Sequence, residues 1–275
     1  MAEQPAGSRN LAPCWPCWLK RDDTLGPRLR PSKHYMDHLR HALVINDPSQ
    51  AARLAGSRRL CLDLGLDCRR VRPPALDHPA VSRCMRVARG RCSTEQEQQR
   101  QCQALTPKEC SILLAHAAAW RAIARTALTG STRGQPALVI EDDAILSAGS
   151  PGRSLVTRLR SEPSAPVAHL GLCLPSWCFD QQQCRCERHG DGGGGTEVAC
   201  TGLCAHAYRL TPAGADLMLR RHKRWPHAKV DVIFPRAPMI GGTAPCEAGG
   251  AIEGDVGAIC QNRSLRPMYD PALGR

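Results

Sequence analysis

The feature that most constrains this chain is an apolar run that ends abruptly in three acids. Residues 137–143 read Ala-Leu-Val-Ile-Glu-Asp-Asp. The apolar part has the composition of a short buried strand, as in a parallel sheet covered on both faces. Ligands bind beyond the carboxyl ends of strands in open α/β sheets, so Glu141, Asp142 and Asp143 are expected beside a ligand. A strand that ends in a solvated acidic loop is an equally good interpretation of the tripeptide alone.

Three carboxylates so close together repel one another unless a cation or hydrogen-bond donors offset their charge. Oxygen ligands of this kind suit Mg²⁺ or Mn²⁺, and these ions in turn bind phosphate. The acidic tripeptide therefore raises the hypothesis of a metal-dependent site for a phosphorylated ligand.

The composition limits the class of protein. A chain of 275 residues suits one large α/β domain or two small ones. The net charge of +12 favours anionic partners such as a nucleotide, although abundant arginine alone would also produce it. We expect no nucleic acid as a partner, because the arginines are scattered and no basic and aromatic residues alternate as on an RNA-binding sheet.

The chain has 16 cysteines, which is many for a cytosolic protein. Disulfides or unpaired thiols are the favoured interpretation. A zinc site is the alternative, but only Cys14 and Cys17 have the Cys-x-x-Cys form, without a second half. The largest group of cysteines flanks a glycine-rich stretch at 192–195.

No apolar stretch reaches the roughly 20 residues that cross a bilayer, so we expect no transmembrane segment. Residues 1–10 are polar and lack the apolar centre of a signal peptide. Taken literally, the protein would be cytoplasmic. If an N-terminal signal is missing from the chain, its cysteines would instead suit the lumen of the ER or Golgi.

The first half of the chain alternates between strand and helix signals. Residues 1–40 have no steady period and are predicted to be a disordered or loosely packed arm. A strand is predicted at 41–46, an amphipathic helix at 50–64 and a second strand at 68–76. This order is typical of a βαβ unit. Residues 78–104 are rich in Arg, Gln and Cys and are predicted to form an insertion.

The second half begins with a strong helix signal. Thr106 is an N-cap, proline follows it, and Glu109 completes a capping box, so a helix is predicted from 106 to about 128. Its apolar face is predicted to contain Ile112, Leu113, His116, Trp120 and Ile123. Further strands are predicted at 167–171 and 204–210, a cysteine-rich insertion at 173–204, a helix at 211–222, an apolar element at 230–234 and an irregular tail at 236–275.

Six of these segments, in order, resemble glycosyltransferase family 25, which includes lipooligosaccharide and procollagen galactosyltransferases. The helix with Glu109, His116 and Trp120 resembles the family helix that carries Leu-Thr-x-x-Glu, Ser-His and Trp. Residues 138–144 match its Glu-Asp-Asp-Ala strand. The other matching residues are Val44, Ile45, Asn46, Arg53, residues 71–77, Ala207, Tyr208, Ala215, Val230 and Asp231.

The resemblance covers about residues 41–235 and implies an α/β fold of the GT-A-like (Rossmann-like) class. It would have a mixed, mostly parallel sheet flanked by helices, interrupted by cysteine-rich loop insertions at about 78–104 and 173–204. The arm and the tail lie outside it. Asp47, His78 and Ala115 stand where the family has Leu, Gly and Ser.

The resemblance also implies transfer of a hexose, galactose or glucose, from a UDP-sugar to a hydroxyl of a glycan or protein acceptor, with inversion and with Mn²⁺ or Mg²⁺. A carboxylate-held metal offsets the charge that grows on the diphosphate leaving group. Glu141 and Asp143 have the one-residue gap of a DxD motif. We predict Asp143 as a metal ligand and Glu141 as a candidate second ligand. Glu141 and Asp142 are otherwise expected to contact the ribose or waters bound to the metal.

Asn46 and Arg53 are candidate donor-binding residues, because asparagine can hydrogen-bond uracil or ribose and arginine can bind phosphate. Arg53 could equally be a solvated helix residue.

Three further residues are catalytic candidates. Asp231 lies within an apolar segment, where burial would raise its pKa and suit it as a general base; capping a backbone amide or pairing with arginine is the alternative. Glu109 is a catalytic candidate, but its position in the capping box favours a structural role. His116 lies on an apolar helix face, so it is either a satisfied core histidine or a site residue. His206 could be a late metal ligand, but its alternating strand favours packing.

Two other functions remain as alternatives. The chain could be a catalytically inactive relative that keeps the fold as a binding module, which the three departures motivate. It could also be a basic, cysteine-rich protein that binds zinc or nucleic acid.

Overall fold

The structure is a computed structural model. It describes part of the chain. The described residues are 39, 41–94, 105–126, 136–146, 155–157, 159, 165–173, 185–190, 196–201, 203–226, 228–234, 237–238, 255–257 and 259–261.

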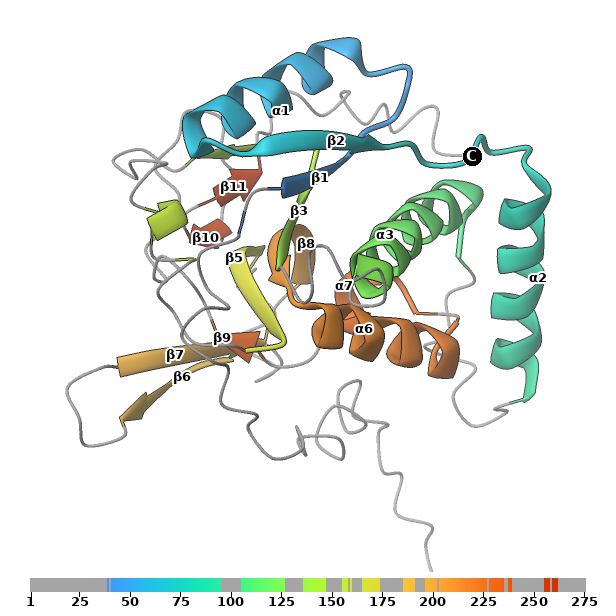
Figure 1. The fold of residues 1–275 in the computed structure, drawn as a ribbon. Helices are drawn as coiled ribbons and strands as arrows, with labels where there is room; N and C mark the ends of the chain where they lie inside the picture. Colours follow the sequence, from blue (N-terminus) through green and yellow to red (C-terminus); the bar gives the residue numbers. More distant parts are fainter. Residues whose placement is uncertain are drawn as a thin grey trace, which may run out of the picture.

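A mixed sheet of six strands forms the centre of the molecule, in the order β10-β5-β8-β3-β1-β2 (Figure 1). The strands β2, β1 and β3 are parallel neighbours, whereas β8 is antiparallel to both β3 and β5, and β10 is antiparallel to β5. Four strands (β1, β2, β3 and β5) therefore run in the same direction. Their bounds are β1 His41–Ile45, β2 Asp67–Val71, β3 Ala137–Glu141, β5 Val167–Cys173, β8 Leu203–Leu210 and β10 Asp255–Gly257.

Helices cover both faces of this sheet, which confirms the coarse prediction of an α/β fold. Figure 1 shows α1 on one face and α3, α6 and α7 on the other, with α2 outside α3. Two separate apolar clusters fill the layers between helices and sheet. The helix bounds are α1 Ala51–Leu64, α2 Pro79–Thr94, α3 Pro107–Thr126, α6 Pro212–Arg224 and α7 Val230–Ile233.

Side chains of β1 and β3 alternate between the two apolar layers. Leu43, Ile45 and Val139 belong to the cluster under α3, whereas Val44 and Ile140 belong to the cluster under α1. Because both faces are buried, these strands read as continuous apolar runs. The same alternation sends consecutive residues at the end of β3 to opposite faces of the sheet.

The N-terminal capping interactions of two helices, α3 and α6, form as predicted. Glu109 N–H donates to Thr106 Oγ1 at 3.2 Å, and Glu109 Oε2 accepts from Thr106 N–H at 2.8 Å, which completes the capping box. At α6, Thr211 Oγ1 accepts a hydrogen bond from Gly214 N–H at 3.1 Å.

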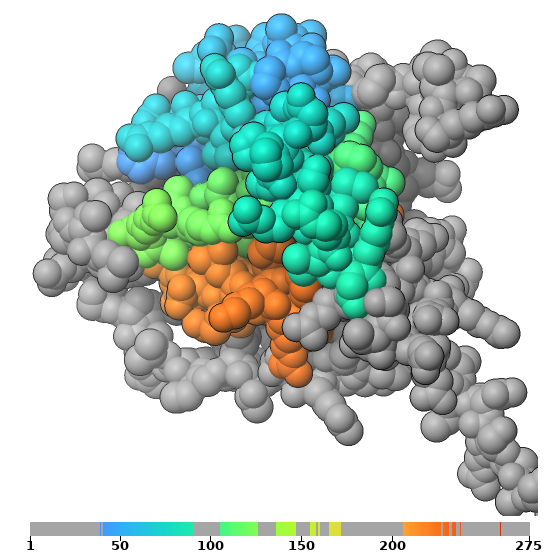
Figure 2. Space-filling view, turned by 90° about the vertical axis from the view of Figure 1, so that its right-hand side faces the viewer, coloured from blue at the N-terminus to red at the C-terminus, as the bar shows by residue number. Residues whose placement is uncertain are grey.

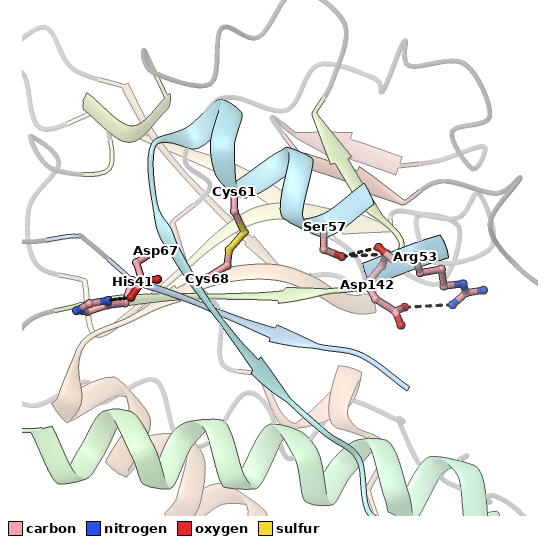
Figure 3. Close-up of a disulfide and its surroundings, with 7 residues drawn as sticks. All are labelled: His41, Arg53, Ser57, Cys61, Asp67, Cys68 and Asp142. Carbon is pink, nitrogen blue, oxygen red and sulfur yellow. Dashed lines mark hydrogen bonds and ion pairs between the residues drawn. A yellow bond between two sulfur atoms is a disulfide. The ribbon is translucent and has the colours of Figure 1, made fainter. Parts of the chain in front are cut away.

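A disulfide between Cys61 and Cys68 joins α1 to the following strand β2 (Figure 3). The turn between them contains Gly65, which ends α1 in the left-handed conformation with φ of 67°. Glycine adopts this conformation without the steric penalty of a side chain. The bond confirms that two of the chain's cysteines pair.

The strand expected at 68–76 is shorter than predicted. It ends at Val71, because Pro73 and Pro74 have no backbone N–H for a ladder.

The segment at 78–104 is not simply a loop insertion, since its first part forms α2. Val81 and Ala88, seven residues apart, are both fully buried in the cluster that contains α3. Two helical turns separate these positions, so they share one helix face, and the arginines between them concealed this short apolar stripe in the sequence.

The later insertion and the tail also contain strands where loops were expected. Within 173–204, β6 Arg185–Gly190 and β7 Thr196–Thr201 pair as an antiparallel hairpin, and β9 Ala237–Pro238 joins its edge. Within the tail expected to be irregular at 236–275, β10 extends the central sheet, and β11 Ile259–Gln261 pairs with β4 Ala144–Leu146. The apolar segment at 230–233 is the short helix α7.

Several predictions cannot be compared with the structure. Of the predicted N-terminal arm at 1–40, only Leu39 is described, and it is fully buried. The remainder of the arm and Cys14 and Cys17 lie outside the described residues. Among the helices that are described, none combines the length and the apolar character needed to cross a membrane.

Candidate functional site

Asn46 and the three acids lie together at the carboxyl ends of two neighbouring parallel strands. In the ladder between β1 and β3, Ile45 is level with Glu141, so Asn46 lies level with Asp142. Asn46 is fully buried, and Asp142 and Asp143 are 7% and 6% exposed. Acidic side chains this deeply buried require compensating partners.

Asp142 turns toward α1, and Figure 3 shows its carboxylate facing Arg53 of that helix. Its Oδ2 accepts a hydrogen bond from Asn46 Nδ2 at 2.7 Å, and its Oδ1 pairs with Arg53 Nη1 at 3.2 Å. The side chains of Arg53 and Asp142 are only 13% and 10% exposed, so solvent screens this ion pair weakly. The network fixes the β3–β4 turn to β1 and α1.

Ser57 adds a backbone contact to the same network. It lies one helical turn after Arg53, and its hydroxyl is within hydrogen-bond distance of Arg53 O at 3.0 Å and Asp142 O at 3.3 Å (Figure 3). Ser57 was not among the site residues predicted from the sequence. Its four-residue spacing from Arg53 places both on one face of α1, which is the signal that could have identified it.

Asn46 has a buried acceptor without a donor. Its Nδ2 donates to Asp142 and to Gln50 O, which assigns the other atom of the amide as the carbonyl oxygen. That oxygen, Oδ1, is buried and accepts no hydrogen bond within the described part of the chain. Buried polar atoms are nearly always paired, so this one is available to a donor group of a ligand.

Glu141 turns to the opposite face of the sheet, toward α3. Its Oε1 lies 3.1 Å from Nε2 of His116, which is fully buried, whereas the Glu141 side chain is 22% exposed. His116 Nδ1 lies 2.7 Å from the Tyr208 hydroxyl, and Trp120 Nε1 donates to that hydroxyl at 2.9 Å. The predicted apolar face of α3 therefore contains a series of hydrogen-bonded polar groups that ends at Glu141.

The hydrogen bonds that link Trp120, Tyr208, His116 and Glu141 can all be donated in one direction, toward Glu141. Trp120 N–H can only donate, so the Tyr208 oxygen accepts from it and its own proton is directed at His116 Nδ1. In the tautomer that accepts this proton at Nδ1, Nε2 of His116 donates to the Glu141 carboxylate. This tautomer is assigned from the hydrogen bonds. Burial raises the pKa of Tyr208 well above its ordinary value, so the hydroxyl remains a donor at neutral pH.

Glu109 lies farther along the same side of the molecule. Position 116 of α3 is beside the end of β3, whereas position 120 is beside Tyr208, which pairs with Val139 earlier in β3. The helix therefore runs antiparallel to β3. Its N-terminus lies beyond the carboxyl edge of the sheet, so Glu109, two turns before His116, is about 10 Å farther out along the helix axis.

Glu109 is paired with a cation there. Lys229 Nζ lies 2.7 Å from Glu109 Oε1. Burial alone would raise the pKa of Glu109, but the hydrogen bonds from Lys229 and from Thr106 outweigh it, so the pKa is below its ordinary value. A carboxyl with a lowered pKa and a cation partner is a structural acid, which favours the capping role over catalysis.

Asp231, the predicted general base, lies in α7. Lys229 precedes this helix, so its pair with Glu109 places the start of α7 beside the N-terminus of α3. The backbone of Asp231 is thus near the same edge of the sheet. Its side chain lies outside the described residues, and its role stays a prediction.

His206 is held by packing rather than by a site. It is fully buried, and its Nε2 lies 2.9 Å from the backbone oxygen of Ile259 in β11. Gly171 of β5 lies against the same atoms, since a Cβ there would overlap both Ile259 O and His206 Nε2. The preference for packing over metal binding at His206 agrees with this contact.

The donor chemistry of the acidic turn fits a hard divalent cation. Glu141 and Asp143 supply carboxylate oxygens, and Mg²⁺ in proteins is commonly held by one or two carboxylates plus substrate phosphates. The described residues contain no group of three or more His, Cys, Asp or Glu arranged as a metal cage.

No protein-family model matches the sequence, and no curated protein is significantly similar to it. The resemblance to glycosyltransferase family 25 therefore remains a prediction based on motifs.

Proposed function

We propose that the chain is a metal-dependent glycosyltransferase that moves a hexose from a UDP-sugar to a hydroxyl of a glycan or protein acceptor. The observation that supports this most is that the acids at the end of β3 have different partners. Asp142 is anchored to Asn46 and Arg53, while Glu141 is oriented from the opposite face by His116. Glu141 and Asp143 lie at the carboxyl edge, where α/β sheets bind ligands.

Glu141 and Asp143 would hold Mn²⁺ or Mg²⁺, which supplies positive charge opposite the diphosphate leaving group. His116 keeps the Glu141 carboxylate in one orientation by donating to Oε1. The free acceptor Asn46 Oδ1 would receive an N–H or hydroxyl of the nucleoside. Arg53, already beside Asp142, adds positive charge to the same edge for a phosphate.

The acceptor hydroxyl requires a base on the other side of the sugar for direct displacement with inversion. Asp231 is our candidate, because its helix starts beside the N-terminus of α3 at this edge. Glu109 is the weaker candidate, since the pair with Lys229 lowers its pKa and makes it a poor proton acceptor.

Metal-dependent hydrolysis of UDP-galactose and UDP-glucose tests this proposal. We expect turnover with MnCl₂ that is abolished by excess EDTA and by Asp143→Asn. Asp216→Asn is the matched control, because Asp216 is an exposed acid paired with Arg220 on α6. Far-UV circular dichroism establishes that each variant folds. Equal turnover in excess EDTA would refute the proposal.

A nucleotide-binding module without catalysis is the second candidate. One observation favours it: the predicted donor-binding residues Asn46, Arg53 and Asp142 bind one another. Calorimetry with UDP separates the two functions. Binding of UDP without hydrolysis of any hexose donor supports the module, and hydrolysis supports the transferase.

A further inference from the structure

Two cysteine thiols contact each other where α2 packs on α3. Cys84 in α2 is partly buried, and Cys110 in the first turn of α3 is fully buried. They are close enough for a hydrogen bond between the thiol groups, and both pack in the same apolar cluster. Figure 2 shows α2, in teal, on the outside of the molecule.

The pair is built into the fold rather than placed by chance on the surface. Val81 and Ala88 of α2 are fully buried on either side of Cys84 along the helix. Packing at these two positions fixes the rotation of α2 and directs Cys84 at α3. Disulfides require sulfur atoms that approach closely from suitably spaced backbones, and a contact between thiols from two packed helices meets the first requirement.

Elsewhere in the described part of the chain, a disulfide joins Cys61 to Cys68. Structural disulfides form and persist in oxidising compartments and are rare where glutathione and thioredoxin keep thiols reduced. Conditions that oxidise Cys61 and Cys68 act on every pair of thiols that folding brings together.

We propose that Cys84 and Cys110 form a second disulfide in the mature protein, which fastens α2 to α3. The two thiols lose two protons and two electrons, and one sulfur–sulfur bond forms. The oxidant is a disulfide of low molecular weight or of an oxidoreductase, such as glutathione disulfide, whose own bond is reduced to two thiols. The exchange passes through a mixed disulfide with one of the two cysteines.

The bond forms during folding, before α2 is fully docked. Burial raises the pKa of the Cys84 thiol and, more strongly, that of the Cys110 thiol. Thiolate is the reactive form, so both groups react slowly once buried. The proposal is independent of any enzymatic activity, because neither cysteine belongs to the candidate site.

A disulfide map of the wild-type protein, folded under a glutathione redox buffer, tests the proposal directly. Free thiols are blocked with N-ethylmaleimide in denaturant, and the protein is digested without reduction and analysed by mass spectrometry. We expect a peptide pair that links Cys84 to Cys110. The Cys61–Cys68 link in the same digest is the internal control. Recovery of both Cys84 and Cys110 as blocked thiols overturns the proposal, and so does a link from either to another cysteine.

The number of free thiols in one variant tests the proposal independently, because the two possible states of the pair predict changes of opposite sign. If the disulfide exists, Cys84→Ala releases Cys110, and the number of thiols titrated in denaturant rises by one. If both residues are thiols, the same variant loses one. Cys110→Ala should likewise raise the number of titrated thiols by one, because it releases Cys84. Loss of the bond should also lower the melting temperature by on the order of 10 °C.

Discussion

His116 and Glu141 are joined across the layer between α3 and the sheet by a hydrogen bond of 3.1 Å from Nε2 to Oε1. The donor is fully buried and the acceptor lies at the edge. The position of Glu141 therefore depends on Tyr208 and Trp120, which orient His116 from inside the core. A substitution of Tyr208 or Trp120 in the core should therefore alter the position of Glu141 at the carboxyl edge.

Tyr208→Phe tests this dependence. It removes the hydroxyl that accepts from Trp120 and faces His116 Nδ1, and it leaves both partners buried without their hydrogen bond. An unsatisfied buried polar group costs about 1–3 kcal/mol, so we expect a loss of that size in the free energy of unfolding. Urea denaturation measures it. In a double-mutant cycle with Trp120→Phe, the two losses should not add; strict additivity would contradict the network.

Asp142→Asn should destabilise the protein more than a surface substitution of the same kind. The change removes the negative charge opposite Arg53 and sets a second amide against Asn46. Because the pair is almost buried, we expect a loss of about 2–4 kcal/mol in the free energy of unfolding.

Asp216→Asn is the matched control for this prediction. It breaks an exposed ion pair with Arg220 and should cost less than about 1 kcal/mol. Similar urea midpoints for the two variants would show that Asp142 does not anchor the turn.

Glu109 should contribute stability that depends on pH. Its pKa in the folded protein is below the ordinary value of 4.5. A lowered folded pKa means that the contribution is present above the unfolded pKa and is lost as pH falls through the folded pKa. The difference in unfolding free energy between wild type and Glu109→Gln should therefore be constant near pH 7 and shrink below about pH 4.5. Urea denaturation from pH 3 to 7 measures it, and a difference that grows toward low pH would contradict the ion pair.

Local sequence signals predicted the elements that define the edge. The capping box at Thr106 and the N-cap at Thr211 form because their partners lie three residues away. The strand before Glu141 was recognisable because burial on both faces makes its apolar run continuous. These features depend on residues that are close together in the sequence, so a local pattern is enough to predict them.

The contacts between distant residues were not predictable in this way. Strand alternation predicts that Asp142 points away from Glu141, but it does not identify Asn46, 96 positions earlier, as the partner of Asp142. The pairing of β11 with β4 joins the tail to the segment after the acidic turn, which depends on the complete fold. In α2, the few apolar positions were too sparse among arginines for the helix to stand out.

Gly171→Ala should be strongly destabilising, because the added Cβ would overlap a backbone oxygen of Ile259 and the ring of His206. Backbone cannot move away as easily as the end of a flexible side chain, and overpacking in a core costs about 1–3 kcal/mol or more. Gly90→Ala is the control: it lies within α2, and a Cβ there meets nothing within 4 Å. Alanine is the better helix former, so this variant should gain about 0.5–1 kcal/mol. Thermal unfolding of the two variants should thus shift in opposite directions, and a Gly171→Ala protein as stable as wild type would show that β11 does not pack against β5.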